Sequence, residues 1–428
     1  MKKIIMSLIL VLLIVLGSAC KGGKTTTVAD NDSNSPTSSI LIADENIDKD
    51  RTLLLSGSYL PKANVKNVSL KSKTSKTAAE FSYELFKNSY SDGENALVSP
   101  ISIMYALAMT QNGAEGNTLS QMENAFGTDR ETLNAYLKSY LASADESLNL
   151  SQSLWVYSNF GVKNSFLQKN ADYFNADIYS TPMDSTTLAD INKWISDKTD
   201  GEIKNALDRI EPNTDIFLIN ATLFNGKWAE DYSDRDISEG DFKNADGSYS
   251  NVNYLHSVES IYLGRYGYSG FAKPYDGGRY VFTALLPNEN SSLSELITSL
   301  DGNDFSELIN EASGENVIVK IPEFEIKYDA PLASMLKKSG ITDAFDMNKA
   351  NFSAMTNSPL YLTKALHSTS IKLNRYGTKA AGSTIIAGTT RGPIAQPPTV
   401  YLDRPFLYAI YDTQADMPIF IGTVTSLK

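Results

Sequence analysis

Hydrophobic periodicity divides the chain into an early helical part and a later part of strands. Between residues 75 and 207, apolar side chains recur every three or four positions, as on one face of a helix. From Asp215 onward, apolar runs rich in β-branched and aromatic residues predict strands. Because helices and strands do not alternate, the pattern indicates an α+β fold and excludes repeated βαβ units.

Three segments fit amphipathic helices. In residues 76–90, Ala79, Phe81, Leu85 and Phe86 share helical spacing. The other two expected helices run from Pro100, capped by Ser99, to Gly113, and within residues 187–207, where the helix ends near Gly201. The expected strands are residues 215–228, 280–288, 316–328, 405–412 and 418–427.

Composition excludes several classes of function. The net charge of −12 disfavours nucleic acid, whose phosphates require clustered Lys and Arg. The chain has one cysteine, Cys20, and two histidines, His256 and His367, whereas structural zinc takes about four such ligands. We therefore expect no disulfide within the chain, no metal, no cofactor and no enzyme built on His or Cys.

The N-terminus has the pattern of a secretory signal peptide. Lys2 and Lys3 precede an apolar stretch that ends at Leu16, followed by small residues. The stretch is about 13 residues long, shorter than the ~20 that a membrane-spanning helix needs. We predict that residues 1–19 are a signal peptide.

The small residues end on Cys20, and this junction resembles the lipobox of bacterial lipoproteins. That resemblance implies a lipidated cysteine at the mature N-terminus, although Gly17 stands where the family usually has Leu. We predict a lipid-anchored protein on the bacterial cell surface or the outer face of a membrane, with simple secretion as the alternative. Residues 20–72 read as the lipid-attachment cysteine and a polar tether, interrupted by the apolar run 52–60.

The body of the chain, residues 73–428, resembles a serpin. The motifs in order are "LVSPISIMYALAMTQNGAEGNTLSQM", "INKWISDKTDGEIK", "LINATLFNGKW", "GITDAFD", "KALHSTSIKLNRYGTKAAGST" and "DRPFLYAIYD" with "IFIGTV". The resemblance covers nearly all of the folded part. It implies helices clustered around a large central sheet, two further sheets and an exposed reactive loop at about residues 377–402.

The resemblance also implies a metastable inhibitor that acts once. A target serine protease attacks the loop and forms an acyl-enzyme, and the loop then enters the main sheet as an added strand. The covalent partner would be the protease, and we expect a monomer. The alternatives are a non-inhibitory serpin that binds a ligand or acts as a chaperone, and a surface enzyme, which the missing His and Cys clusters disfavour.

The start of the loop has small residues that suit insertion. In a strand, alternate residues face opposite sides, so the only early charge, Lys379, falls on the face away from the core. A charge on the other face would be desolvated at considerable cost. A plain loop that is rich in small residues is the competing interpretation. The predicted hinge residues are Arg375, Gly377, Thr378, Ala380, Ala381 and Gly382.

The resemblance places the attacked bond about fourteen residues after the hinge glycine, at Arg391–Gly392. Arg391 is the only charge between Lys379 and Asp403, and a trypsin-like pocket carries a carboxylate that binds Arg or Lys. We therefore predict a trypsin-like target. The alternative is an elastase- or subtilisin-like protease that cuts nearby, at Thr390 or as far back as Ile386.

The hinge departs from the usual serpin pattern. Acidic residues usually precede the hinge glycine, and here Arg375 and Tyr376 do. The family's lysine on a neighbouring strand is replaced by Glu323 in "KIPEF". Since both signs are reversed, we hypothesise an Arg375–Glu323 pair across the top of the sheet.

A polar cluster is expected beneath the point where the main sheet opens. The resemblance places His367 there, bonded to nearby polar residues, and implies that the cluster holds two strands closed until the loop enters. Buried polar groups need such partners. No acid is apparent for a catalytic Ser–His pair. The predicted cluster is Ser99, Ser102, Asn220 and His367.

Overall fold

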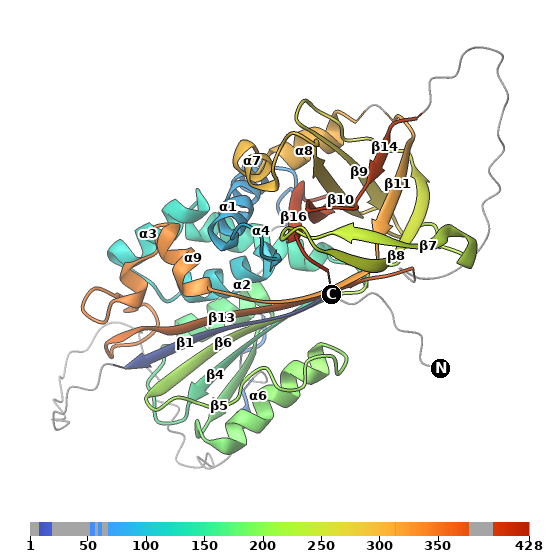
Figure 1. Cartoon of the computed structure of the whole chain (residues 1–428). Helices are drawn as coiled ribbons and strands as arrows, with labels where there is room; N and C mark the ends of the chain where they lie inside the picture. Colours follow the sequence, from blue (N-terminus) through green and yellow to red (C-terminus); the bar gives the residue numbers. More distant parts are fainter. Residues whose placement is uncertain are drawn as a thin grey trace, which may run out of the picture.

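A seven-stranded sheet runs through the computed structural model, which describes residues 8–18, 52–55, 59–61, 67–312, 314–375 and 397–427. Figure 1 shows its central strands lying side by side, with α6 on one face and the other helices toward the opposite side. In spatial order the strands are β12 (Phe324–Ala330), β13 (Leu360–Leu373), β1 (Leu8–Ser18), β6 (Thr214–Phe224), β4 (Leu148–Tyr157), β5 (Asp177–Thr181) and β2 (Leu53–Leu54).

Two smaller sheets complete the strand structure of the described residues. A five-stranded sheet has the order β3 (Ala96–Val98), β16 (Met417–Val424), β15 (Phe406–Asp412), β10 (Tyr280–Pro287) and β9 (Tyr268–Pro274). A four-stranded sheet has the order β14 (Thr399–Tyr401), β11 (Val317–Pro322), β8 (Tyr249–Glu259) and β7 (Ile237–Lys243).

The helices cover the seven-stranded sheet on both faces. Leu12 and Leu218 face the main core, whereas Leu13 and Phe217 pack into a second core together with Trp194 of α6. The helices are α1 (Lys73–Ser89), α2 (Pro100–Gln111), α3 (Gly116–Phe126), α4 (Arg130–Ser143), α5 (Asn164–Phe174), α6 (Ser185–Lys198), α7 (Leu293–Ser299), α8 (Asp304–Asn310) and α9 (Leu332–Lys338). This architecture confirms the predicted α+β fold.

The predicted elements are present, and several of their bounds differ. The strand predicted over 215–228 ends at Phe224, and that predicted over 418–427 ends at Val424. The third helix ends at Lys198, close to the predicted end near Gly201. The segment 316–328 forms two strands in two different sheets, β11 up to Pro322 and β12 from Phe324.

The N-terminal apolar run forms an interior strand of the large sheet, between β13 and β6. Strand β1 is antiparallel to both neighbours, β6 and β13. Its residues from Val11 to Leu16 are at most 3% exposed. Sequence reasoning assigned this run to a signal peptide and did not anticipate a strand, although a short apolar run bounded by small residues also fits a strand buried on both faces.

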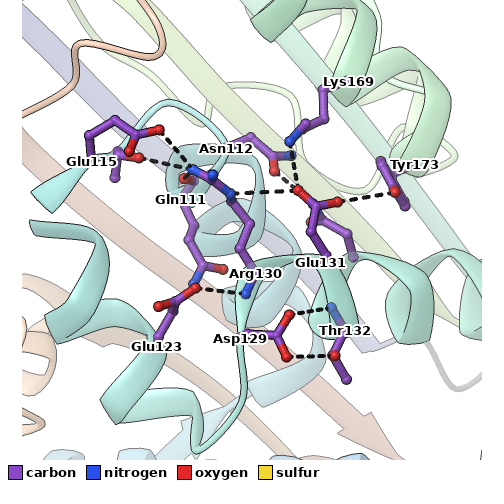
Figure 2. A network of polar contacts seen from close by, with 12 residues as sticks. Gln111, Asn112, Glu115, Glu123, Asp129, Arg130, Glu131, Thr132, Lys169 and Tyr173 are labelled. Carbon is purple, nitrogen blue, oxygen red and sulfur yellow. Dashed lines mark hydrogen bonds and ion pairs between the residues drawn. The ribbon is translucent and has the colours of Figure 1, made fainter.

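A polar network centred on Arg130 of α4 connects α3, α5 and the end of α2. The Arg130 guanidinium donates to the Ala114 carbonyl after α2 at 3.0 Å, and its backbone N–H donates to Glu123 of α3 at 3.0 Å. The next residue, Glu131, pairs with Lys169 of α5 at 2.7 Å (Figure 2). Because the network joins four helices and its charges are paired, it serves structure.

Candidate functional site

Strands β6 and β13 are one strand apart, because β1 lies between them. We call the position that β1 fills the slot. Every residue of β1 from Leu8 to Ser18 faces a partner on β13, and those from Leu8 to Gly17 also face partners on β6. β13 leads directly into the segment that was predicted to be the reactive loop. The slot therefore lies beside the strand from which that segment emerges.

His367 lies in β13, on one side of the slot, and is buried. Its Nε2 accepts a hydrogen bond from the backbone N–H of Ser99 at 3.0 Å. The hydroxyl of Ser99 instead donates to the carbonyl of Ile419, also at 3.0 Å. Ser99 thus binds the histidine through its amide, and its hydroxyl is not activated as a nucleophile.

Burial lowers the pKa of His367 to about 3. The charged imidazolium would lose its hydration in this 1%-exposed position, and no carboxylate compensates. His367 is therefore neutral at physiological pH. With Nε2 as acceptor, the proton of the neutral ring resides on Nδ1.

Asn220 of β6 lies on the other side of the slot. Its Oδ1 accepts from the hydroxyl of Thr222 at 2.8 Å and from that of Ser102 in a shorter bond. The Nδ2 of Asn220 and the Nδ1 of His367 have no partner among the described residues. Both are buried donors, so an acceptor between the two strands would satisfy them.

The predicted cluster is therefore brought together, in an arrangement that differs from the expectation. Leu12 of β1 faces His367 on one side and Asn220 on the other. The residues line an occupied slot and do not hold β6 and β13 in direct contact. The reason is that β1 supplies the ladder partners that the two strands would otherwise find in each other.

The end of β13 is fixed by three contacts. The backbone N–H of Arg375 donates to Glu323 Oε1 at 3.0 Å, while its guanidinium pairs with Asp234. The carbonyl of Asn374 accepts from the indole N–H of Trp228 at 3.1 Å. The hypothesised Arg375–Glu323 contact exists through the backbone, and the side-chain ion pair is made with Asp234.

Several predicted site residues lie outside the described residues. These are the lipidation site Cys20, the reactive bond Arg391–Gly392 and the hinge residues Gly377, Thr378, Ala380, Ala381 and Gly382. Their roles stay predictions.

The fold and the site define a protein built around a seven-stranded sheet in which β1 separates β6 from β13. This chain belongs to the serpin (serine protease inhibitor) family, whose model matches residues 76–427. An uncharacterized serpin-like protein of Methanosarcina mazei is 31% identical over 355 residues, covering 78% of this chain and 82% of the relative. Mouse neuroserpin is 27% identical over 373 residues, covering 81% of this chain and 90% of its own.

A solved structure supports the same assignment. The crystal structure of tengpin, a thermophilic serpin in the native state, superposes with a TM-score of 0.79 at 38% identity. The match covers 88% of this chain and 100% of tengpin. Serpins as a family inhibit proteases and are not themselves catalysts, so protease inhibition is the general activity of this class.

Two features of the described residues bear on other kinds of site. Among these residues no group of three His, Cys, Asp or Glu side chains is placed to hold a metal ion. No described helix is long and apolar enough to cross a membrane.

Sequence reasoning missed two participants of the site. Asp234 sits on a single helical turn capped by Ser233, and only the short Ser-x-x-Asp spacing at Asp236 hinted at that turn. Asp215, at the lower end of β6, accepts the backbone N–H of Ser18 at 2.6 Å. Neither contact could be predicted, because each joins segments distant in sequence.

Proposed function

We propose that this protein is a suicide-substrate inhibitor of serine proteases. The protease serine attacks the carbonyl carbon of Arg391, the bond to the Gly392 nitrogen breaks, and the new amine leaves with the C-terminal peptide. An acyl-enzyme then links Arg391 to the protease. Insertion of the loop beside β13 carries the protease away before water hydrolyses the ester.

The slot between β6 and β13 is the single observation that carries this proposal. A strand seated there is antiparallel to β13, which is the direction that a segment takes when it folds back after β13. Both faces of the seated strand are covered by apolar side chains. The small uncharged residues from Ala380 to Thr384 suit this position, because they fill it without burying a charge.

A trypsin-like target follows from Arg391. The guanidinium is suited to a bidentate contact with a carboxylate at the base of a specificity pocket. An elastase- or subtilisin-like target that uses Thr390 or Ile386 remains the second candidate.

The test mixes the chain that begins at Cys20 with trypsin and, separately, with an elastase. We expect an SDS-stable adduct with trypsin and a released peptide that begins at Gly392. Arg391→Ala should lose the trypsin adduct, whereas the control Lys379→Ala should keep it, because Lys379 lies twelve positions earlier in the sequence.

Two other results would change the conclusion about the target protease or about trapping. An adduct with elastase alone keeps the trapping mechanism and moves the bond. Cleavage by both proteases without any adduct contradicts the proposal and identifies a non-inhibitory serpin. The unusual hinge residues Arg375 and Tyr376 would then be the first candidates for the cause.

We also propose that Cys20 carries a lipid that anchors the exported protein to a membrane. Its support is the lipobox-like junction after the apolar run. Cys20→Ser should move the protein from the membrane fraction to the soluble fraction. If the wild type is soluble after export, the protein is secreted and the anchor is refuted.

A further inference from the structure

Strand β1 occupies the position that the proposed mechanism requires to be free. Three kinds of contact hold β1 in this position. It is paired on both edges, from Leu8 to Ser18 on β13 and from Leu8 to Gly17 on β6. It is buried on both faces, and its lower end is tied to Asp215 through the Ser18 N–H.

The side chains of β1 alternate between two apolar environments. Leu12, Ile14 and Leu16 join the main core. The intervening valines and leucine join the second core with Trp155 and Trp194. A strand that fits both layers of the molecule is a specific occupant and excludes any other strand from the slot.

In the middle of the slot, β1 leaves two neighbouring polar groups without hydrogen-bond partners. Leu12 offers no acceptor to the buried donors on either side, His367 Nδ1 and Asn220 Nδ2. Unpaired buried donors are unfavourable. A strand with a hydroxyl or carbonyl side chain at this position would satisfy these donors and bind more favourably. Because β1 does not, such a strand could replace it.

We infer that residues 8–18 act as an intramolecular plug while they remain attached. A chain that carries the plug cannot insert its loop, so a protease cleaves it as a substrate without being trapped. Because the same residues belong to the predicted signal peptide, its removal would open the slot and would couple export to activation. This inference rests on the proposed function.

The test uses the full chain produced without export, so that its N-terminus is kept. The variant Ile14→Asp/Leu16→Asp places two carboxylates against the main core, away from the two unpaired donors beside Leu12, and should expel β1 because unpaired buried charge is strongly unfavourable. The matched control Ile4→Asp/Met6→Asp adds the same two charges outside the described strand. Each chain is mixed with trypsin and examined on denaturing gels.

A second readout does not depend on inhibition. In a Trp228→Phe background, the remaining tryptophans are Trp155 and Trp194, both packed in the second core beside β1. Expulsion of β1 should raise their quenching by acrylamide and the amide exchange of β6 and β13. Unchanged exchange in β15 and β16 would show that the variant is folded.

The inference predicts no adduct for the wild type and the control, and an adduct for Ile14→Asp/Leu16→Asp. A synthetic peptide with the sequence of residues 8–18 should abolish that adduct again. Equal adducts from all three chains would overturn the plug and leave the proposed function intact. If no chain forms an adduct, trapping fails, and equal tryptophan shielding in wild type and variant would overturn the plug as well.

Discussion

At the scale of single residues, His367 makes the stability of the molecule depend on pH. Its pKa in the folded chain is about 3, below the ordinary value of 6.5, so the unfolded chain binds the extra proton between these values. The contribution of His367 is complete above about pH 6.5 and is lost as the pH falls toward 3. The expected slope is at most about 1.4 kcal/mol per pH unit.

The measurement is thermal unfolding of wild type and His367→Gln between pH 7 and 4.5. The variant should show a flatter pH dependence than the wild type. His256→Gln, which changes the exposed histidine of β8, is the control and should keep most of the slope. Equal slopes for wild type and His367→Gln would contradict the assignment of a neutral buried histidine.

Arg375 gives a second prediction at this scale. Its guanidinium pairs with Asp234, whose side chain is 92% exposed, and its backbone N–H bonds Glu323. A double-mutant cycle on Arg375→Ala and Asp234→Ala should give a coupling below about 1 kcal/mol that weakens with salt. The cycle with Glu323→Ala should give less, because alanine keeps the backbone N–H. A larger coupling to Glu323 would reinstate the side-chain pair.

How far the sequence predicts single residues depends on how local their partners are. Ser99, Ser102, Asn220 and His367 were placed in one cluster, and the structure gathers them. Which atom bonds which was not predictable, because the amide of Ser99 meets His367 only in the packed molecule, where α2 lies against β6 and β1.

At the scale of elements, the lower end of β1 depends on one glycine. A Cβ on Gly17 would lie 2.5 Å from the carbonyl oxygen of Asn213. Gly17→Ala should therefore shift this end of the strand and disturb the Ser18–Asp215 bond, at about 1–3 kcal/mol. Ser18→Ala is the control, since the bond uses the backbone. Equal thermal midpoints for Gly17→Ala and wild type of the full chain would contradict the seating of β1.

The pattern of helices and strands was largely predictable because each element carries its own periodicity. Helix α1 illustrates this, since its predicted apolar residues Ala79, Phe81, Leu85 and Phe86 are all buried. The strand role of residues 8–18 was missed for a physical reason. A signal peptide and a strand buried on both faces require the same short apolar run, and only its partners, β6 and β13, distinguish them.

At the scale of the whole molecule, the central feature is the position between β6 and β13 in the large sheet, which β1 fills. With β1 seated, β6 and β13 are separated by a full strand along their lengths. In the proposed mechanism the reactive loop takes that position after cleavage, and the apolar surface buried there drives the trapping. The stability of the cleaved chain therefore reports directly on the mechanism.

The most direct measurement is the thermal unfolding midpoint of the chain that begins at Cys20, before and after cleavage in the reactive loop. Insertion buries several apolar side chains, so cleavage should raise the midpoint by on the order of 10 °C or more. In the full chain, where β1 fills the slot, cleavage should leave the midpoint nearly unchanged. An unchanged or lowered midpoint in the shorter chain would contradict insertion and, with it, the proposed trapping mechanism.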